Sequence, residues 1–225
     1  MIKLRGFWRL SILALLFVCA IALTNCSPRS GNNAGGSVLV YGASGQPANL
    51  EPGNVTDGNS LIVQQQIYNR LIQFKEGSTD LEPALATAWN VSKDGKTWTF
   101  KLRQGVKFQD GTDFNADAVK FNVDRWWDKQ NPNGFRNAGK TYEIWSQIFG
   151  GYKGEPDSLV QEMKVVDPST VQFVLKQPFA AFPNAIASSF FGIASPAAIQ
   201  KAGASYGTPA GGAVGTGAFV FKEWR

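Results

Sequence analysis

The sequence predicts an α/β fold in which antiparallel β-hairpins combine with short amphipathic helices. Alternating apolar and polar residues flank an Asp-Gly turn at 94–95, and a second such pair of runs flanks the turn at 167–170. Alternation is typical of half-buried strands, and Asp-Gly supplies the backbone angles of a tight hairpin. Between the hairpins, apolar residues recur at helical spacing from Ala116 onward. The aromatic content of 12% suits a substantial hydrophobic core.

The region before the first hairpin is expected to contain one strand and one helix. Residues 37–43 form a short apolar run that ends beside a glycine, which predicts a buried strand. A loop rich in Gly, Pro, Asn and Ser follows. Apolar residues then recur over 61–74 at the spacing of an amphipathic helix, and Asn59 or Ser60 stands where the helix would be capped.

The first hairpin has one apolar and one polar face, and a helix follows it. Trp98, Phe100 and Leu102 alternate with polar residues, so one face of this strand is expected to be buried. Asp110-Gly111 predicts a further turn. Asn115 is placed to cap the next helix. The apolar residues of that helix are expected to share its inner face, together with Phe121 or Asn122: Val119, Val123 and Trp126.

The remainder is expected to be loop-rich, with short elements. Residues 129–156 are rich in Gly and Asn and suggest an irregular segment with a short helix at 142–149. The second hairpin follows, and Pro178 ends it. The last predicted elements are two short helices, a glycine-rich loop and a final strand, at 179–189, 195–203, 207–217 and 218–224.

The N-terminus has the pattern of a secretion signal. Lys3, Arg5 and Arg9 precede an apolar run that is short for a membrane span and suited to a signal peptide, which we assign to residues 1–25. The residues before Cys26 resemble a bacterial lipoprotein box, although Asn25 departs from the small residue usual there. Cys26 is therefore expected to carry a lipid anchor, and the alternative is an ordinary cysteine near the cleavage site. Residues 26–37 are small and polar and predict a flexible tether.

Composition excludes several classes of function. Three of the 22 Lys and Arg residues lie in the leader and none of the 17 Asp and Glu residues do, so the balance from Cys26 onward is 19 against 17. These charges are scattered, which argues against nucleic-acid binding. The chain has no histidine, which removes His-based catalysis and the commonest metal ligand. Cys19 leaves with the leader, so no disulfide or cysteine metal site is expected, and no cofactor is implied.

Several motifs recur in one known family. They are WNVSKDGKTWTFKLR from Trp89, GVKFQDGT from Gly105, NADAVKF from Asn115, SPAAI from Ser195 and GTGAF from Gly215. In these motifs and their order the chain resembles the family-5 extracellular solute-binding proteins of ABC importers, from about residue 37 to the end. The resemblance implies a periplasmic binding protein-like α/β fold (class II, family-5 type). It also implies that only the lobe I portion is present, with an inserted small α+β subdomain.

The resemblance also implies a domain division. Residues 38–75 would begin the main subdomain of lobe I, 76–205 would form its smaller subdomain, and 206–225 would return to the main one. Members of this family are considerably longer than this chain and have a second lobe. We therefore expect an N-terminal fragment that lacks lobe II.

By resemblance, the expected function is that of a lipid-anchored, extracytoplasmic receptor that closes on a solute and delivers it to an ABC permease. Peptides are the preferred ligand class, and the receptor would act as a monomer. The absence of histidine disfavours nickel, although a metal chelate, haem and glutathione stay open as ligands. The alternatives are a truncated sensing or interaction protein without transport, and a carboxylate-based hydrolase. Carboxylates that can be nominated for the hydrolase are Asp110 with Asp113, or Glu76, Asp80 and Glu82.

The resemblance places candidate ligand contacts before a Leu-Asp-Pro-like motif, which reads Leu-Glu-Pro at 50–52 here. The candidates are Gln46, Pro47, Ala48 and Asn49. The backbone groups of Gln46 and Ala48 would pair with an extended peptide, whereas Pro47 can only accept. An ordinary surface loop is the competing interpretation.

Two further segments have competing interpretations. Tyr142 and Trp145 are candidates for the border of the cleft, and we weigh core packing ahead of that role. The segment Gly215-Thr216-Gly217 lacks the spacing and the lysine of a phosphate-binding loop, so we interpret it as a crossing between subdomains. Asp110 is interpreted as a turn residue.

Overall fold

The computed structural model describes residues 38–224, and the contacts divide the chain between Gly42 and Ala43. In the first unit, residues 38–42 form no helix or strand. Four of their side chains are exposed: Val38, Leu39, Val40 and Tyr41. The strand predicted at 37–43 is therefore wrong over its described residues. A strand requires a neighbour for its backbone hydrogen bonds, and the described strands pair only with one another.

The predicted signal peptide, Cys26 and the tether to residue 37 lie outside the described residues. Within residues 38–224, no helix has the length and apolar character needed to cross a bilayer.

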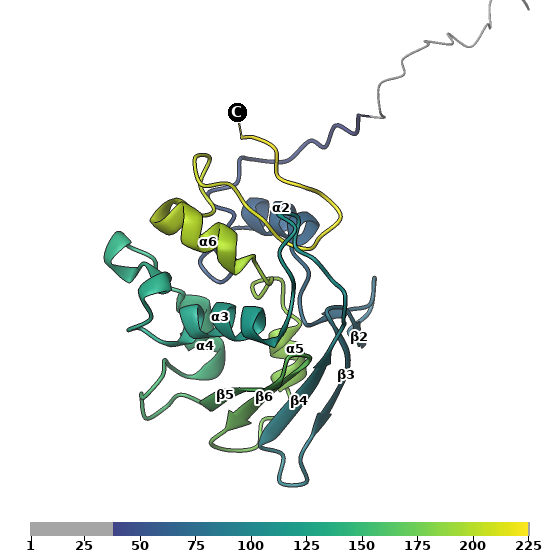
Figure 1. The fold of residues 1–225 in the computed structure, drawn as a ribbon, viewed down its shortest axis with the longest axis vertical. Helices are drawn as coiled ribbons and strands as arrows, with labels where there is room; N and C mark the ends of the chain where they lie inside the picture. The colour runs from purple at the N-terminus through teal and green to yellow at the C-terminus, as the bar shows by residue number, and fades with distance from the viewer. Residues whose placement is uncertain (1–37, 225) are drawn as a thin grey trace, which may run out of the picture. The chain divides into compact units, whose positions relative to one another are not determined.

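A four-stranded antiparallel sheet lies at one end of the second unit, with helices above it in the view of Figure 1. Its strands, in spatial order, are β3 (Ala86–Val91), β4 (Thr97–Leu102), β6 (Thr170–Leu175) and β5 (Val160–Asp167). Both predicted hairpins are confirmed, because β3 pairs with β4 and β5 with β6. Trp98, Phe100 and Leu102 are buried on one face of β4, as their alternation predicts. Because β4 also pairs with β6, the two hairpins form one sheet.

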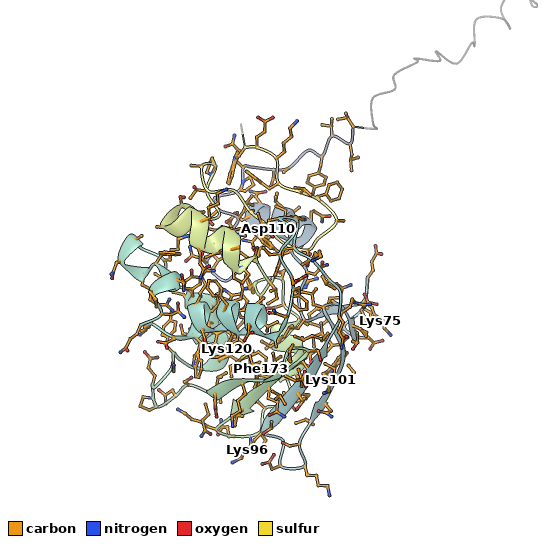
Figure 2. All side chains as sticks on the ribbon, viewed as in Figure 1. Lys75, Lys96, Lys101, Asp110, Lys120 and Phe173 are labelled. Atoms are coloured by element: carbon orange, nitrogen blue, oxygen red, sulfur yellow. The ribbon has the colours of Figure 1, made fainter. Side chains whose placement is uncertain are left out.

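Three helices pack around this sheet: α3 (Ala116–Trp127), α4 (Glu143–Phe149) and α5 (Phe182–Ile186). Asn115 caps α3 as predicted, since its side-chain oxygen accepts a hydrogen bond from the Ala118 amide at 2.9 Å. Val119, Val123, Trp126 and Asn122 lie on the buried side of α3. Phe173 of β6 is fully buried in the same core (Figure 2). The first hydrophobic cluster therefore lies between the sheet and these helices.

Removal of the Asn115 cap is expected to weaken α3 measurably. Asn115→Ala deletes the acceptor for the Ala118 amide and should lower the free energy of unfolding by about 1 kcal/mol. Asn115→Asp keeps an acceptor at the same position and should stay close to wild type. Urea unfolding followed by tryptophan fluorescence measures both. Equal losses in the two variants would contradict the capping role.

The helix predicted over 61–74 begins earlier and ends earlier. Helix α2 spans Gly58–Ile67, and its cap is Asp57, not Asn59 or Ser60. Residues 72–74 instead form β1 (Ile72–Phe74), which pairs with β2 (Leu81–Pro83). Residues 72–74 form a strand because pairing with residues 81–83 is a tertiary contact that overrides their local helical periodicity.

The C-terminal part contains α6 (Pro196–Ala202) and the 3-10 turn η3 (Gly203–Ser205), and its described residues form no final strand. Two further 3-10 turns lie between α3 and α4: η1 (Pro132–Gly134) and η2 (Arg136–Ala138). The strand predicted at 218–224 is wrong over this range, because the segment returns to the end of α2 and not to a strand. The amides of Gly217 and Phe219 donate to the carbonyls of Ile67 and Gln66 at 2.8 and 3.0 Å. These bonds satisfy carbonyls that the end of a helix leaves without partners.

A second, smaller hydrophobic cluster lies between α2 and α6. Its buried members are Leu50, Ile67, Tyr68, Ala194, Ile199, Tyr206 and Ala213. The cluster joins the chain before and including α2 to the chain around and after α6, and the segment 46–54 contributes Leu50 to it.

Candidate functional site

The predicted ligand-binding segment 46–49 is only partly available to a ligand. Gln46 and Ala48 are exposed, whereas Pro47 and Asn49 are half-buried. The amides of Ala48 and Asn49 donate to the Ser60 hydroxyl at 2.8 and 3.2 Å, so the Ala48 N–H is already occupied. The backbone of Gln46 forms no hydrogen bond to another described residue. Of the two backbones proposed to pair with a peptide, that of Gln46 is the one whose N–H has no partner within residues 38–224.

The chain immediately after this segment is fixed by bonds to distant parts of the fold. The Leu50 amide, the Pro52 carbonyl and the Gly53 amide each bond to a group from another segment at 2.7–3.1 Å. Their partners are the Gly207 carbonyl, the Trp126 indole N–H and the Phe190 carbonyl. Backbone geometry at 48–53 is therefore determined by long-range contacts. Residue 46 lies between this segment and Ser44, whose hydroxyl donates to the Asn59 side chain at 3.2 Å.

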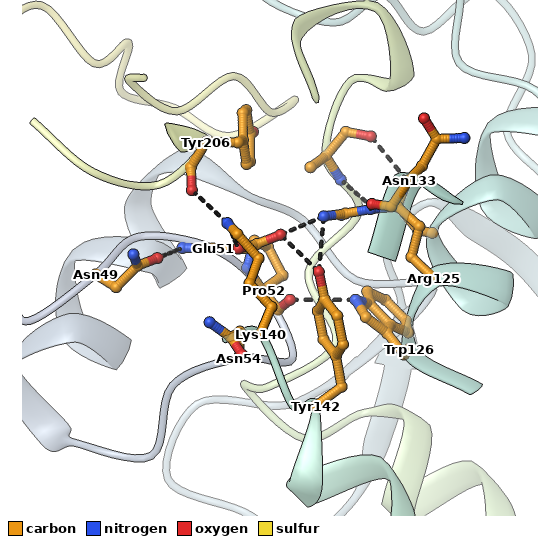
Figure 3. A network of polar contacts seen from close by, with 12 residues as sticks. Asn49, Glu51, Pro52, Asn54, Arg125, Trp126, Asn133, Lys140, Tyr142 and Tyr206 are labelled. Atoms are coloured by element: carbon orange, nitrogen blue, oxygen red, sulfur yellow. Dashed lines mark hydrogen bonds and ion pairs between the residues drawn. The ribbon is translucent and has the colours of Figure 1, made fainter. Parts of the chain in front are cut away.

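A buried ionic network surrounds Glu51 (Figure 3). One carboxylate oxygen, Oε1, accepts from Arg125 Nη2 and from the Tyr142 hydroxyl, the latter at 2.8 Å. The other oxygen, Oε2, accepts from the Lys140 ammonium. The side chains of Glu51 and Arg125 are fully buried, and that of Lys140 is 7% exposed. Two cations thus face one carboxylate, and buried charges of this kind persist only when paired.

Each cation of the network also binds a backbone carbonyl. Arg125 Nε donates to the Asn133 carbonyl at 2.6 Å, and Lys140 Nζ donates to the Tyr206 carbonyl at 3.0 Å. The network therefore connects Glu51 with α3, with the 133–142 segment and with the chain after η3.

Three tyrosine hydroxyls near Glu51 act as neutral hydrogen-bonding groups. Burial raises the pKa of Tyr142 far above its usual range, and the nearby Glu51 carboxylate adds to this shift. Burial raises the pKa of Tyr206 to about 12 and also raises that of Tyr68. The Tyr68 hydroxyl donates to the Leu50 carbonyl at 2.9 Å and lies 3.0 Å from the Tyr206 hydroxyl. Phenols held neutral in this way can orient the backbone but cannot serve as bases near neutral pH.

Tyr142 and Trp145 both lie in the interior, where the packing interpretation places them. Tyr142 has no exposed surface and its hydroxyl is engaged by Glu51 and Arg125, so its predicted ligand contact stays untested and gains no support here. The Trp145 ring packs against Phe149, with ring centroids 4.5 Å apart.

The glycines at 215 and 217 allow the close approach expected of a crossing segment. A side chain at Gly215 would meet the Ile67 carbonyl, and one at Gly217 would meet the Gln66 carbonyl. This contact with the end of α2 agrees with the interpretation of the segment as a crossing and not as a phosphate-binding loop.

Asp110 has the hydrogen bonds of a turn residue and lies beside α6 (Figure 2). Its carboxylate accepts from the Thr112 amide at 3.0 Å and from the hydroxyls of Thr112 and Ser195 at 2.6 and 2.5 Å. Partial burial would raise the pKa of Asp110, but these hydrogen bonds outweigh it and lower the pKa. The carboxylate is therefore held ionised for a structural purpose.

Four of the five carboxylates nominated for a hydrolase, all except Glu76, have hydrogen-bond or ion-pair partners of their own. Asp113 is paired with Lys107 at 2.6 Å, and Asp80 lies 3.7 Å from the Lys75 ammonium. Glu82 accepts from the side-chain amide of its cross-strand neighbour at 2.7 Å. Between residues 38 and 224, no group of acidic or sulfur ligands is arranged to hold a metal ion.

The network around Glu51 is not predicted by any sequence pattern. Its members are far apart in the chain: Arg125 is 74 residues from Glu51, and Lys140 is 89 residues from it. A faint signal existed, since Arg125 follows Asn122 by three residues on the side of α3 that turns inward. A cation at such a position requires a buried counter-charge, but periodicity does not identify which acidic residue supplies it.

Comparison with known proteins identifies a family and several relatives. The family model described as bacterial extracellular solute-binding proteins, family 5 Middle, matches residues 80–225. The chain is 39% identical to the dipeptide-binding protein of Escherichia coli (strain K12), over 83% of this chain and 35% of that protein. It is 35% identical to the glutathione-binding protein GsiB of Escherichia coli O6:K15:H31, over 94% of this chain and 35% of that protein.

The fold matches solved structures as well. The dipeptide binding protein from Pseudoalteromonas sp. SM9913 in complex with Met-Leu is 31% identical, with a TM-score of 0.72 over 83% of this chain and 37% of that structure. The chain thus spans about a third of the length of the relatives it matches.

Proposed function

Because the chain belongs to the bacterial extracellular solute-binding proteins of family 5, we propose that it supplies one side of the solute-binding cleft of an ABC importer receptor. Members of this family are periplasmic transport receptors and not enzymes. In such a receptor the ligand is held when two lobes close on it, and no covalent bond is made or broken. The family match over residues 80–225 is the observation that carries this proposal.

We assign peptides as the ligand class. Two of the relatives are a dipeptide-binding protein and a dipeptide binding protein in complex with Met-Leu, and a third is a glutathione-binding protein, whose ligand is itself a short peptide. The exposed, unbonded backbone of Gln46 suits the same chemistry, because an extended peptide can bond to it as an added strand would. Side-chain specificity would then be broad.

The proposed division into subdomains is supported by the two hydrophobic clusters. The larger cluster draws on residues 71–193, within and just before the proposed smaller subdomain at 76–205. The smaller cluster joins residues 50–68 to Tyr206 and Ala213, as expected if 38–75 and 206–225 belong to one main subdomain of lobe I. It also includes Ala194 and Ile199 from the end of the proposed smaller subdomain. A lipid at Cys26 would keep such a monomeric receptor beside its permease.

A titration with the dipeptide Met-Leu tests the proposal directly. In NMR spectra of the 15N-labelled chain, the amides of residues 45–49 should shift, apart from Pro47, which has no N–H. The expected dissociation constant is about 1 mM, because this segment would contact the ligand from one side only. Gln46→Ala retains the backbone N–H and should bind as wild type does. Gln46→Pro removes it and should lose binding. Unchanged amides at 45–49 up to about 10 mM dipeptide would overturn the peptide assignment.

A further inference from the structure

We infer that Lys140 is a positioning residue for the ligand-binding segment 46–49, which it orients through Glu51 and the Tyr206 carbonyl. The inference rests on the proposed function only in calling this segment a binding segment. Lys140 touches no candidate ligand-binding residue directly, so its effect would pass through the backbone that follows the segment.

The Lys140 ammonium connects the chain at Glu51 with the chain at Tyr206, and these two chain segments are also hydrogen-bonded to each other. It donates to Glu51 Oε2 and, at 3.0 Å, to the Tyr206 carbonyl (Figure 3). The next carbonyl along the chain, that of Gly207, accepts from the Leu50 amide at 2.7 Å. Lys140 therefore binds the chain neighbour of each partner in the Leu50–Gly207 hydrogen bond.

The charges indicate that Lys140 is not needed to neutralise Glu51. Arg125 already donates to the carboxylate, and the Tyr142 hydroxyl adds a neutral donor. With Lys140 present the three ionised side chains carry one positive charge in excess, and without it Glu51 and Arg125 form a balanced pair. Stabilisation of Glu51 alone would not require this second buried cation. Buried ion pairs are weak sources of stability and can instead specify geometry, so we assign Lys140 a bridging role.

The residues that Lys140 holds in place, 50–51, follow the segment 46–49 directly in the chain. The amides of Ala48 and Asn49 are held by Ser60, and the Asn49 side chain accepts from the Glu51 amide at 2.7 Å. Gln46, two residues before Ala48, has no such bond. Gln46 therefore lies between Ser44, whose hydroxyl donates to the Asn59 side chain at 3.2 Å, and the anchored residues that follow. Loosening the residues that follow would enlarge the range of positions a ligand must select from.

Lys140→Met tests the inference by amide hydrogen exchange in the full chain. The expected result is exchange at Leu50 and Asn49 about tenfold faster than in wild type, while the sheet amides of Phe100 and Phe173 change much less. A purely structural lysine would accelerate exchange in the sheet and at 49–50 alike, which would overturn the inference. Unchanged exchange at 49–50 would overturn it as well.

A matched control and a fallback variant accompany the experiment. Lys107 forms an exposed ion pair with Asp113, so Lys107→Met should leave exchange at 49–50 unchanged. If Lys140→Met does not fold, Lys140→Gln keeps an uncharged NH2 group with two N–H donors, and the same comparison of Leu50 with the sheet is made in that variant.

Binding of Met-Leu separates this inference from the proposed function. If wild type binds the dipeptide, Lys140→Met should bind several-fold more weakly. Faster exchange at 49–50 in a chain that binds no dipeptide would uphold the positioning role and contradict the peptide assignment. Dipeptide binding that Lys140→Met leaves unchanged, with unchanged exchange, would uphold the assignment and contradict the positioning role.

Discussion

Replacement of Glu51 by glutamine is expected to lower the free energy of unfolding by about 3–5 kcal/mol, the range typical of removing one partner from a buried ion pair. The glutamine side chain has nearly the same shape and keeps one acceptor oxygen. It carries no charge, so Arg125 and Lys140 would stay buried and cationic with no counter-ion beside them. Urea unfolding followed by tryptophan fluorescence measures the change.

Asp113→Asn is the matched control for this substitution. It makes the same chemical change in an ion pair with Lys107 whose side chains are 61% and 73% exposed. Water screens such pairs, so the control should unfold close to wild type. A Glu51→Gln variant as stable as this control would show that the network does not depend on the carboxylate charge.

The elements predicted correctly are those whose signals lie within a few consecutive residues. The β3–β4 hairpin is specified by alternation and by Asp94-Gly95, and Gly95 has the positive φ of 72° that such a turn requires. The Asn115 cap is another local signal, since its acceptor serves an amide three residues later. No distant part of the chain is needed to form either contact.

The elements predicted wrongly depend on a distant partner. The run at 38–43 and the segment 218–224 are apolar enough for strands, yet neither lies beside a described strand that pairs with it. Residues 72–74 continue a helical pattern and still become β1, because β2 offers backbone partners. Strand formation is decided by pairing, which a single-sequence pattern does not specify.

In the candidate site, too, the features that depend on local sequence were predictable and those that depend on distant contacts were not. The segment 46–49 was found through its motif context, because the Leu-Glu-Pro sequence at 50–52 marks its end. That the Ala48 amide is already used by Ser60 was not predictable from spacing, since it depends on how α2 docks. The network at Glu51 is still further from prediction, because its cations come from α3 and from an irregular segment.

Gly207→Ala is expected to lower the free energy of unfolding by about 3 kcal/mol, through strain at a positive φ and a collision with the anchored backbone. Gly207 has φ +84°, and a Cβ there would lie 2.6 Å from the Glu51 amide nitrogen and 2.8 Å from Glu51 Cβ. Real Cβ atoms do not approach backbone atoms so closely, so residues 49–51 or the Gly207 turn must move. The Leu50 amide, which donates to the Gly207 carbonyl, should show the movement as a large NMR shift.

Gly139→Ala separates the two causes, since both glycines have nearly the same positive φ. Gly139 has φ +87°, and a Cβ there would meet nothing within 4 Å, so this variant should lose only about 1 kcal/mol from the conformational strain. The difference between the two variants in urea unfolding then measures the close approach of Gly207 to the segment around Glu51. Equal losses would mean that the backbone at 49–51 moves away from the added Cβ at no measurable cost in stability. That backbone would then be adjustable and not fixed.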